Sequence, residues 1–406
     1  MGFQWGFRPD SGGEALLMRL STRRIITATL GVALLAGPAV ATASAAPDAS
    51  AARSDSGRND AALRQAMSDM VAGGVAGVQV RVHDDQGDWA ASAGVRELGG
   101  DRRPPTDGRF RIGSVTKTFV ATVVLQLVSE GRVGLDTPVD RYLPGLLPAG
   151  DRTTVRMILQ HTSGLYSYSD DLPIGEGATQ IKPEFLRVRF RHFDPEQLVG
   201  MATAKPLLFE PGSQWSYSDT NYIVAGLLIK AVTGRAWGTE VTGRIIRPLG
   251  LHGTSVPGDD PTLPWPNVRG YAQLDGAAVD VTELNPSMAG AAGSMISTTA
   301  DVNRFFGALL GGTKTLQGRA LLAPAQLAEM RRTRPVAEGV DFGLGILRIT
   351  TPCGTAIWGH TGGIPGYATT AFTTADGRRQ TTISVTTNKN PQSGSETRML
   401  FASFCP

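Results

Sequence analysis

Segments with the pattern of β-strands occur near both ends of this 406-residue chain, and a long stretch of helical and loop patterns separates them. Val78, Val80 and Val82 alternate with polar residues, which is the period of a strand. Later segments rich in β-branched and aromatic residues also favour strands: residues 342–349, 356–359, 368–374 and 381–387. Because strands need partners, the simplest fold is α+β, with one antiparallel sheet built from both termini, flanked by helices, and a mostly helical domain inserted.

This arrangement predicts two domains. Residues 61–114 together with residues 335–406 form the sheet domain, and residues 115–334 form the helical inserted domain. In the sheet domain, apolar residues at helical spacing predict a helix that stops at Gly73, and residues 396–404 predict a closing helix. Since ligand sites commonly lie between domains, we expect a cleft where the two meet.

The N-terminal segment has the order of a signal peptide. Basic residues between Arg19 and Arg24 precede an apolar run over residues 25–36, and small residues follow up to Ala45. The run is about a dozen residues long, whereas a membrane span needs roughly twenty. We therefore expect residues 1–45 to be removed on export, leaving a secreted protein without a stable membrane anchor.

Two further features belong to this region. Residues 1–17 precede Met18, which opens a complete leader by itself, so we interpret them as an over-extended start. Adjacent Arg23 and Arg24 leave the twin-arginine route open beside the general one. Residues 46–60 lack apolar spacing and predict a flexible linker.

Composition excludes several classes of protein. Hydrophobic residues make up 41% of the chain and charged residues 18%, which argues against disordered and many-span membrane proteins. The formal net charge is only +3 and no run of five basic residues occurs, so we expect no nucleic-acid partner. The five histidines are scattered and no zinc or phosphate-loop motif is found, so we expect no metal and no cofactor. We expect a monomer.

The chain has two cysteines, Cys353 and Cys405, and both follow the leader. An exported protein with an even number of cysteines is expected to oxidise them, so one disulfide is the prediction. Two buried free thiols are the alternative.

A serine and a lysine three residues apart open a predicted helix. Ser114 and Lys117 follow Gly113, and apolar residues then recur at helical spacing as far as Gly131. At this spacing the amine can approach the hydroxyl, and the positive end of the helix dipole favours an alkoxide there. A buried lysine loses its proton more readily and can act as a base. Taken alone, the pair also fits a helix cap followed by a solvated lysine.

A tyrosine motif follows about a hundred residues later. Tyr217-Ser218-Asp219 lies between a turn and an apolar helical segment over residues 222–232. A phenol at this point can carry protons during catalysis. A loop tyrosine beside a helix N-cap is the alternative.

A glycine-rich segment ends one of the predicted strands. Its sequence is Gly359-His360-Thr361-Gly362-Gly363. Small residues let a ligand backbone lie close to the strand, and a backbone N–H can point at an oxyanion. A tight turn is the alternative. Another histidine, His161, is interpreted as buried and hydrogen-bonded rather than catalytic.

These three elements, in this order, resemble those of the serine β-lactamase and penicillin-binding-protein superfamily. The likeness is to the branch of class C β-lactamases and DD-peptidases, above all to soluble actinomycete D-alanyl-D-alanine carboxypeptidases/transpeptidases. It covers residues 61–405 and includes the segments Phe110 to Gly113 and His161 to Leu165. The resemblance implies a β-lactamase/transpeptidase-like fold, and it supports a disulfide between Cys353 and Cys405, since those carboxypeptidases have a cysteine pair near the end of the chain.

The resemblance also implies a role for each matched residue. Ser114 would be the acylated nucleophile, Lys117 its proton acceptor or electrostatic partner, and Tyr217 the group that passes a proton to the leaving amine. Which of Lys117 and Tyr217 is the base stays open. The N–H groups of Ser114 and Gly363 would form the oxyanion hole. The substrate-binding residues implied in this way are Asp219, His360, Thr361, Gly362 and Gly363.

Three positions depart from the family pattern. Asp219 stands where the family usually has Asn, and a carboxylate beside Lys117 favours the charged lysine, which moves the base role toward Tyr217. Gly363 stands where carboxypeptidase-like members tend to have Thr. Leu347 stands at the strand position of an Arg, with Arg348 beside it. Recognition of a terminal carboxylate is therefore the least supported part of the resemblance.

The leading hypothesis is a secreted serine hydrolase that attacks acyl-D-alanyl-D-alanine peptides through a Ser114 acyl-enzyme, with penicillins as trapping pseudo-substrates. Its partners would be a peptidoglycan-type peptide or a β-lactam. One alternative keeps the chemistry but makes the protein a class C-like β-lactamase, an esterase or a D-amino-acid peptidase. Another is a non-catalytic binding module, against which the presence of all three candidate catalytic residues argues.

Overall fold

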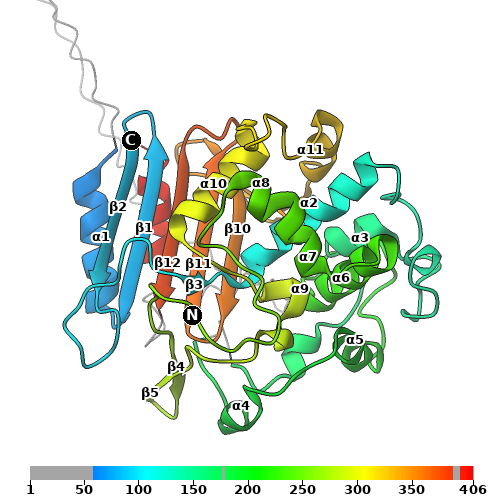
Figure 1. Ribbon diagram of the computed structural model, residues 1–406, viewed down its shortest axis with the longest axis horizontal. Helices are drawn as coiled ribbons and strands as arrows, with labels where there is room; N and C mark the ends of the chain where they lie inside the picture. Colours follow the sequence, from blue (N-terminus) through cyan, green and yellow to red (C-terminus); the bar gives the residue numbers. More distant parts are fainter. Residues whose placement is uncertain (1–57, 176–178, 387–393, 406) are drawn as a thin grey trace, which may run out of the picture. The chain divides into compact units, whose positions relative to one another are not determined.

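One antiparallel sheet of eight strands joins the two ends of the described chain, in the order β2-β1-β12-β11-β10-β9-β8-β7. The computed structural model describes residues 58–175, 179–386 and 394–405, so the predicted signal peptide and the linker up to residue 57 lie outside the described residues. Strand β1 (Gly77–Asp84) pairs antiparallel with β12 (Gln380–Thr386), so the two N-terminal strands β2 and β1 form one edge of the sheet beside the C-terminal strands (Figure 1). The predicted α+β fold is confirmed, whereas the two domain boundaries stay predictions.

The remaining elements follow in chain order. The other strands of the large sheet are β2 (Gly87–Gly94), β7 (Arg334–Ala337), β8 (Val340–Phe342), β9 (Leu347–Thr350), β10 (Ala356–Ile364) and β11 (Tyr367–Thr374). Two small sheets pair β3 (Phe110–Arg111) with β6 (Ile296–Ser297), and β4 (Tyr271–Leu274) with β5 (Ala277–Asp280). The helices are α1 (Asp60–Ala72), η1 (Gly113–Val115), α2 (Thr116–Ser129), η2 (Val139–Arg141), α3 (Val155–Leu159), η3 (Tyr168–Asp171), α4 (Pro183–Val188), α5 (Pro195–Thr203), α6 (Asp219–Thr233), α7 (Trp237–Val241), η5 (Thr242–Ile246), α8 (Arg247–Leu249), η6 (Pro286–Met288), α9 (Gly290–Gly293), α10 (Thr299–Gly311), α11 (Pro324–Met330) and α12 (Ser395–Ala402).

The predicted strand over residues 342–349 is wrong in one respect, because the structure divides it between β8 and β9. The chain turns between them at Gly343 to Ile346. A Cβ on Gly343 would lie 2.2 Å from the Met330 carbonyl oxygen, and Gly345 has φ +73° and donates its N–H to the Leu159 carbonyl. The two glycines therefore make a hairpin where apolar composition alone predicts a continuous strand.

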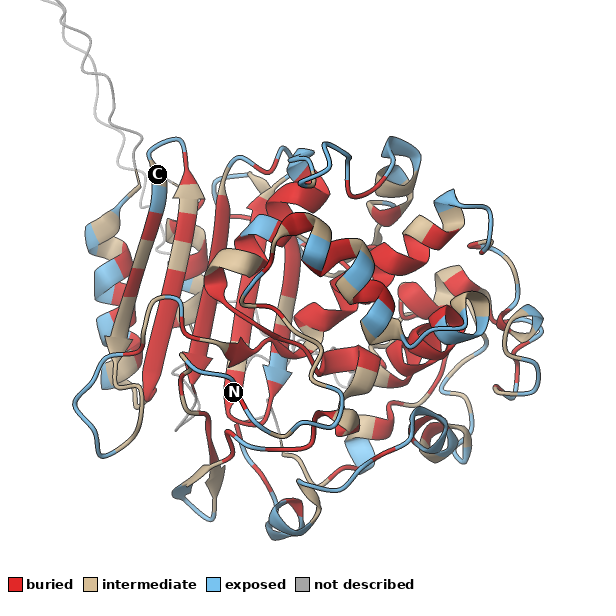
Figure 2. Cartoon of the chain, in the orientation of Figure 1, coloured by how far each residue is buried: buried red, intermediate tan, exposed pale blue. Residues whose placement is uncertain are grey.

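Different elements cover the two faces of the sheet. Helices α1 and α12 contact each other and bury apolar side chains against one face. Helix α10 contacts β1, β11 and β12 on the other face, where the Thr382 hydroxyl donates to Asn303. The sheet strands and α2 are among the most continuously buried parts of the chain (Figure 2).

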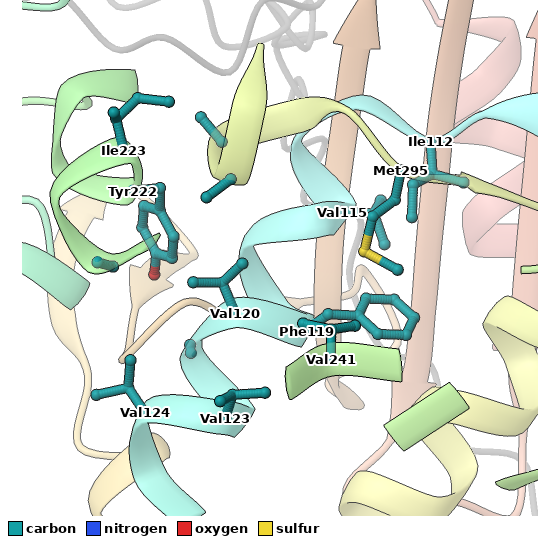
Figure 3. Packing of buried hydrophobic residues seen from close by; sticks show 14 of the residues in the cluster. Ile112, Val115, Phe119, Val120, Val123, Val124, Tyr222, Ile223, Val241 and Met295 are labelled. Carbon is teal, nitrogen blue, oxygen red and sulfur yellow. The ribbon is translucent and has the colours of Figure 1, made fainter. Parts of the chain in front are cut away.

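Helix α2 is held by apolar contacts on several sides. Phe119, Val120 and Val123 project from it toward Tyr222 of α6, Val241 of α7 and Met295 (Figure 3). The Phe119 ring also stacks on Phe305 of α10, with 3.6 Å between centroids. The start of α2 is therefore fixed between α6 and the sheet, and that is where Ser114 and Lys117 lie.

Candidate active site

Ser114 lies in η1, the short turn between β3 and α2. Gly113 has φ +52°, in the left-handed region, and a Cβ on it would lie 2.7 Å from the Gly363 nitrogen. A Cβ on Gly362 would lie 2.0 Å from the Ile112 carbonyl oxygen. Both residues must therefore be glycine for the Ser114 turn to lie directly against β10. The small size of Gly362, which the sequence analysis attributed to a ligand, makes room for the chain itself.

Lys117 is completely buried, so the alternative of a solvated lysine is wrong. Its Nζ lies 2.9 Å from the Ser114 Oγ, 2.6 Å from the Asp219 Oδ1 and 2.7 Å from the Ala292 carbonyl oxygen. Three acceptors match the three N–H donors of an ammonium group. Burial lowers the pKa of Lys117, and the Asp219 carboxylate opposes that change.

Tyr217 faces the same two side chains. The Lys117 Nζ lies 5.0 Å from the centroid of its ring, and the Ser114 side chain is one of the groups that act on the pKa of its phenol. Burial first, and then the negative charge of Asp219, raise the pKa of Tyr217 well above its usual range. The phenol therefore keeps its proton and is suited to donate it.

Asp219 is the first residue of α6 and reaches the site from the side opposite α2. Its N–H donates to the Ser167 Oγ at 2.9 Å, and its carboxylate accepts from Lys117. The side chain is 23% exposed, unlike that of its lysine partner. The structure thus places a partly exposed carboxylate where a substrate donor could reach it.

The two halves of β10 have different neighbours. Residues 356–359 pair with β9 on one side and β11 on the other, whereas residues 360–364 pair only with β11 among the described residues. Gly363 is exposed and Thr361 is half-buried. The half that carries the candidate binding residues therefore keeps an open edge, which is the geometry to which an extended peptide can add.

His360 is buried at the start of this open half. Its Nδ1 bonds the Thr361 carbonyl, which assigns the ring proton to that nitrogen, and its ring centroid lies 6.5 Å from that of Tyr217. Burial, reinforced by the positive charge of Lys117, lowers the pKa of His360 to about 3. The imidazole is therefore neutral at ordinary pH.

The structure thus gathers residues from three distant parts of the sequence. Lys117 contacts Ser114, Asp219 and the ring of Tyr217, and His360 lies beside Tyr217. Gly363 lies beside the Ser114 turn, as its short approach to Gly113 requires. The roles given to these residues, including the oxyanion hole, stay predictions.

Sequence reasoning missed other side chains of this region. His161 is buried and hydrogen-bonded, as interpreted, but it also stacks on the Tyr217 ring with 4.3 Å between centroids. Asn221 and Ser163 are buried beside it. The only signal was that His161 and Ser163 belong to a family-like segment; nothing in their spacing connects them with Tyr217.

The residue at the family's arginine position and the arginine beside it are both engaged elsewhere. Leu347 is buried in the apolar cluster beneath α1 and α12. Arg348 lies opposite Asp341 in the neighbouring strand, and its Nη1 is 2.7 Å from that carboxylate. The positive charge of Arg348 is therefore already paired.

Cys353 and Cys405 form a disulfide that connects the β9–β10 turn to the end of α12. Within residues 58–175, 179–386 and 394–405, no group of three His, Cys, Asp or Glu side chains is placed to hold a metal ion. No helix in the described part of the chain has the length and apolarity to span a membrane.

Comparison with known proteins agrees with this geometry. The family model described as Beta-lactamase matches residues 60–403. Penicillin-binding protein 4 of Amycolatopsis lactamdurans is 30% identical over 294 residues, which cover 68% of this chain and 69% of that protein.

Two solved structures are similar over most of the described chain. A D-stereospecific amidohydrolase from Streptomyces sp. is 39% identical with a TM-score of 0.77, covering 85% of this chain and 98% of that one. The D-amino acid amidase from Ochrobactrum anthropi SV3, complexed with D-phenylalanine, is 26% identical with a TM-score of 0.72, covering 84% and 98%.

Proposed function

Because this chain belongs to the beta-lactamase family and is a serine hydrolase of that fold, we propose that it hydrolyses amide bonds of D-amino-acid residues through an acyl-enzyme on Ser114. The observation that carries the proposal is the contact of the Ser114 hydroxyl with the buried amine of Lys117, which itself lies over the ring of Tyr217. A hydroxyl between a buried amine and a phenol has one group to take its proton and another to give one.

The electrostatics favour one assignment of the two groups. Burial lowers the pKa of Lys117 and raises that of Tyr217, so Lys117 gives up a proton more readily than an ordinary lysine, whereas Tyr217 stays protonated. We therefore assign the acceptor role to Lys117 in its deprotonated form and the donor role to Tyr217. In this scheme the Ser114 Oγ attacks the carbonyl carbon while Lys117 takes its proton. Tyr217 then donates a proton to the leaving nitrogen as the C–N bond breaks, and Lys117 restores it. Water attacks the acyl-enzyme with the same proton transfers in reverse. This differs from the expectation that Asp219 would move the base role to Tyr217.

The D-amino-acid specificity rests on two supports. The amidohydrolase and the amidase described above are similar over more than four-fifths of this chain. The pairing of Arg348 with Asp341 also leaves that guanidinium committed, which disfavours a substrate recognised by a terminal carboxylate. An amide substrate, or a peptide with an internal D-residue, has no terminal carboxylate at that point and needs no such positive charge.

D-alanyl-D-alanine carboxypeptidase activity is the second candidate. Similarity to penicillin-binding protein 4 favours it, as does the His360-Thr361-Gly362 element on the open edge of β10. A penicillin would then acylate Ser114 and remain attached. Turnover of the penicillin would instead indicate a β-lactamase, and ester cleavage alone would indicate an esterase.

One substrate panel separates these activities. Purified protein is incubated with D- and L-phenylalanine amide, an acyl-D-alanyl-D-alanine peptide and benzylpenicillin, with Ser114→Ala as control. We expect ammonia from the D-amide only, and none from the control. Equal cleavage of both enantiomers would contradict the stereospecificity. Preferential release of D-alanine, with a persistent penicilloyl adduct by intact mass, would establish the second candidate instead.

We also propose that the protein is exported and cleaved near Ala45. The support is the order of basic, apolar and small residues before that position. An oxidising compartment would also suit the pairing of Cys353 with Cys405. N-terminal sequencing of protein collected from the medium tests this, and an intact N-terminus retained in the cells would contradict it.

A further inference from the structure

His161 occupies a backbone position at which glycine is the usual residue. It follows α3, where the Thr162 N–H bonds the Met157 carbonyl and the His161 N–H bonds the Ile158 carbonyl. These two bonds are the Schellman pattern that ends a helix with one left-handed residue. That residue is His161, with φ +59°. The backbone conformation at this position favours glycine, yet the residue is a histidine. A contact made by its side chain should therefore explain why it is there.

Three contacts connect His161 with the segment that carries Tyr217. The Ser216 N–H donates to the His161 carbonyl at 3.0 Å, and the Ser218 N–H donates to the His161 Nδ1 at 3.1 Å. Between these bonds, the Tyr217 ring stacks on the imidazole, with 29° between the ring planes. The residue before Tyr217, the residue after it and its own ring are thus all held by one histidine.

The imidazole is itself held in one orientation. The Asn221 Nδ2 lies 3.2 Å from the His161 Nδ1, and the Asn221 Oδ1 accepts from the Ser163 hydroxyl at 2.6 Å. With Ser218 and Asn221 both donating to Nδ1, the ring proton is assigned to Nε2. Burial, together with the positive charge of Lys117, lowers the pKa of His161 well below its usual value. The ring therefore stays neutral and keeps accepting.

Filling of space does not explain a histidine here. The Nε2 atom is buried and has no hydrogen-bond partner in the described part of the chain. A phenylalanine would fill a similar volume without leaving a buried donor unpaired. What phenylalanine lacks is the acceptor for the Ser218 N–H, so the hydrogen bond at Nδ1 is the property that distinguishes the residue.

We infer that His161 is a positioning residue that fixes the phenol of Tyr217 against Ser114 for proton transfer to the leaving group. The inference rests on the proposed function, because only a poor leaving group such as an amine needs that proton. It assigns His161 no contact with substrate. Its effect is on the rate of the chemical step rather than on substrate binding.

The test compares an amide with an activated ester. D-phenylalanine amide releases ammonia and needs a proton donor, whereas D-phenylalanine 4-nitrophenyl ester releases a stable phenolate and does not. His161→Phe keeps an aromatic ring but removes the acceptor. We expect its kcat on the amide to fall by about 100-fold, the scale of one lost acid–base interaction, with KM little changed and the ester affected by less than about tenfold.

A double-mutant cycle separates positioning from general damage. We expect Tyr217→Phe to show the same loss on the amide, and Tyr217→Phe combined with His161→Phe to be no slower than Tyr217→Phe alone. Losses that multiply, or that are equal on amide and ester, would overturn the inference. His161→Gly, which suits the left-handed backbone and also lacks the acceptor, repeats the measurement if the phenylalanine variant folds poorly.

Phe342→Leu is the matched control. Phe342 contacts the same rings, 4.9 Å from His161 and 6.4 Å from Tyr217 between centroids, and it changes the packing without touching the hydrogen bonds. In Phe342→Leu, the ratio of kcat on the amide to kcat on the ester should stay within about threefold of the wild-type ratio. If wild-type protein cleaves no D-amide, the proposed function fails. The same cycle on release of D-alanine from the acyl-D-alanyl-D-alanine peptide, whose leaving group is also an amine, then decides the inference, with losses that multiply overturning it.

Discussion

The two faces of the large sheet bury different kinds of side chain. Beneath α1 and α12 most buried side chains are apolar, as with Leu63, Met399 and Ile383, and the buried carboxyl group of Glu396 is paired with the Thr370 hydroxyl. Near the start of α2 the structure instead buries Lys117 and His161 completely. Apolar burial stabilises a fold, whereas burial of a charged or polar group costs free energy unless it is paired. The first region thus stabilises the fold. The second region contains buried polar groups that cost folding free energy but can take part in catalysis. Substitutions in the two regions should have opposite consequences.

The largest expected effect is loss of activity without loss of stability. Ser114→Ala should lower amide hydrolysis by at least about 10³-fold, because no other nucleophile is in place. Its melting temperature should stay within a few degrees of wild type, since only one hydroxyl is removed. Activity assays and thermal unfolding of the same preparation check both statements. Appreciable turnover by the variant would make Ser114 an ordinary residue of the fold.

The converse result is expected on the apolar face. Leu63 of α1 is fully buried, so Leu63→Ala should lower the free energy of unfolding by about 2–5 kcal/mol. The kcat should be unchanged, because the main contacts of α1 are with α12, β1 and β2, which carry none of the candidate catalytic residues. Ser68→Ala, on the exposed side of the same helix, is the control and should have little effect in urea unfolding. An activity loss as large as the stability loss would remove the distinction between the faces.

The disulfide belongs to the stabilising region as well. Replacing Cys353 and Cys405 together by Ser should lower the free energy of unfolding by about 2–4 kcal/mol, because the unfolded chain loses a covalent constraint. Activity at moderate temperature should be retained. Intact mass under denaturing conditions, before and after reduction, should differ by two hydrogens in wild type. No difference would mean free thiols.

Acid should destabilise the polar region selectively. His161 and His360 have pKa values below the ordinary 6.5, that of His360 being about 3, so the unfolded chain binds protons that the folded one does not. The contribution of these histidines to the free energy of unfolding is present above pH 6.5 and is lost as the pH falls toward 3. The loss is about 1.4 kcal/mol per pH unit for each histidine.

Urea unfolding at pH 7 and pH 5 measures this slope. His360→Gln should make it shallower, since one of the two depressed groups is gone. His252→Gln is the control, because His252 is exposed, and it should leave the slope as in wild type. Equal slopes in all three proteins would contradict the assignment.

The smallest expected effect concerns the carboxylate at the site. Asp219→Asn removes the negative charge that favours the ammonium form of Lys117 and opposes ionisation of Tyr217. Without this charge, the pKa of Lys117 and the pKa of Tyr217 should both be lower. The acid limb of the acylation rate should therefore move to lower pH, with acylation near neutrality faster by up to about tenfold. A shift to higher pH, or slower acylation, would show that Asp219 acts on substrate instead.

Local patterns in the sequence account for much of the fold. Alternating valines correctly locate β1, and helical spacing after Gly113 correctly locates α2, because each pattern reports the period of one element. Such a pattern does not predict the break between β8 and β9. It depends on the Met330 carbonyl lying where a side chain on Gly343 would be.

Local sequence patterns predict a sheet that joins both termini and the three elements that carry Ser114, Tyr217 and His360. The complete burial of Lys117 and the contacts of His161 with the segment of Tyr217 are seen only in the folded chain. The two kinds of feature differ in their range along the chain. Periodicity and turn chemistry act between near neighbours, whereas a pKa, an open strand edge or a stacked ring depends on which distant elements pack together.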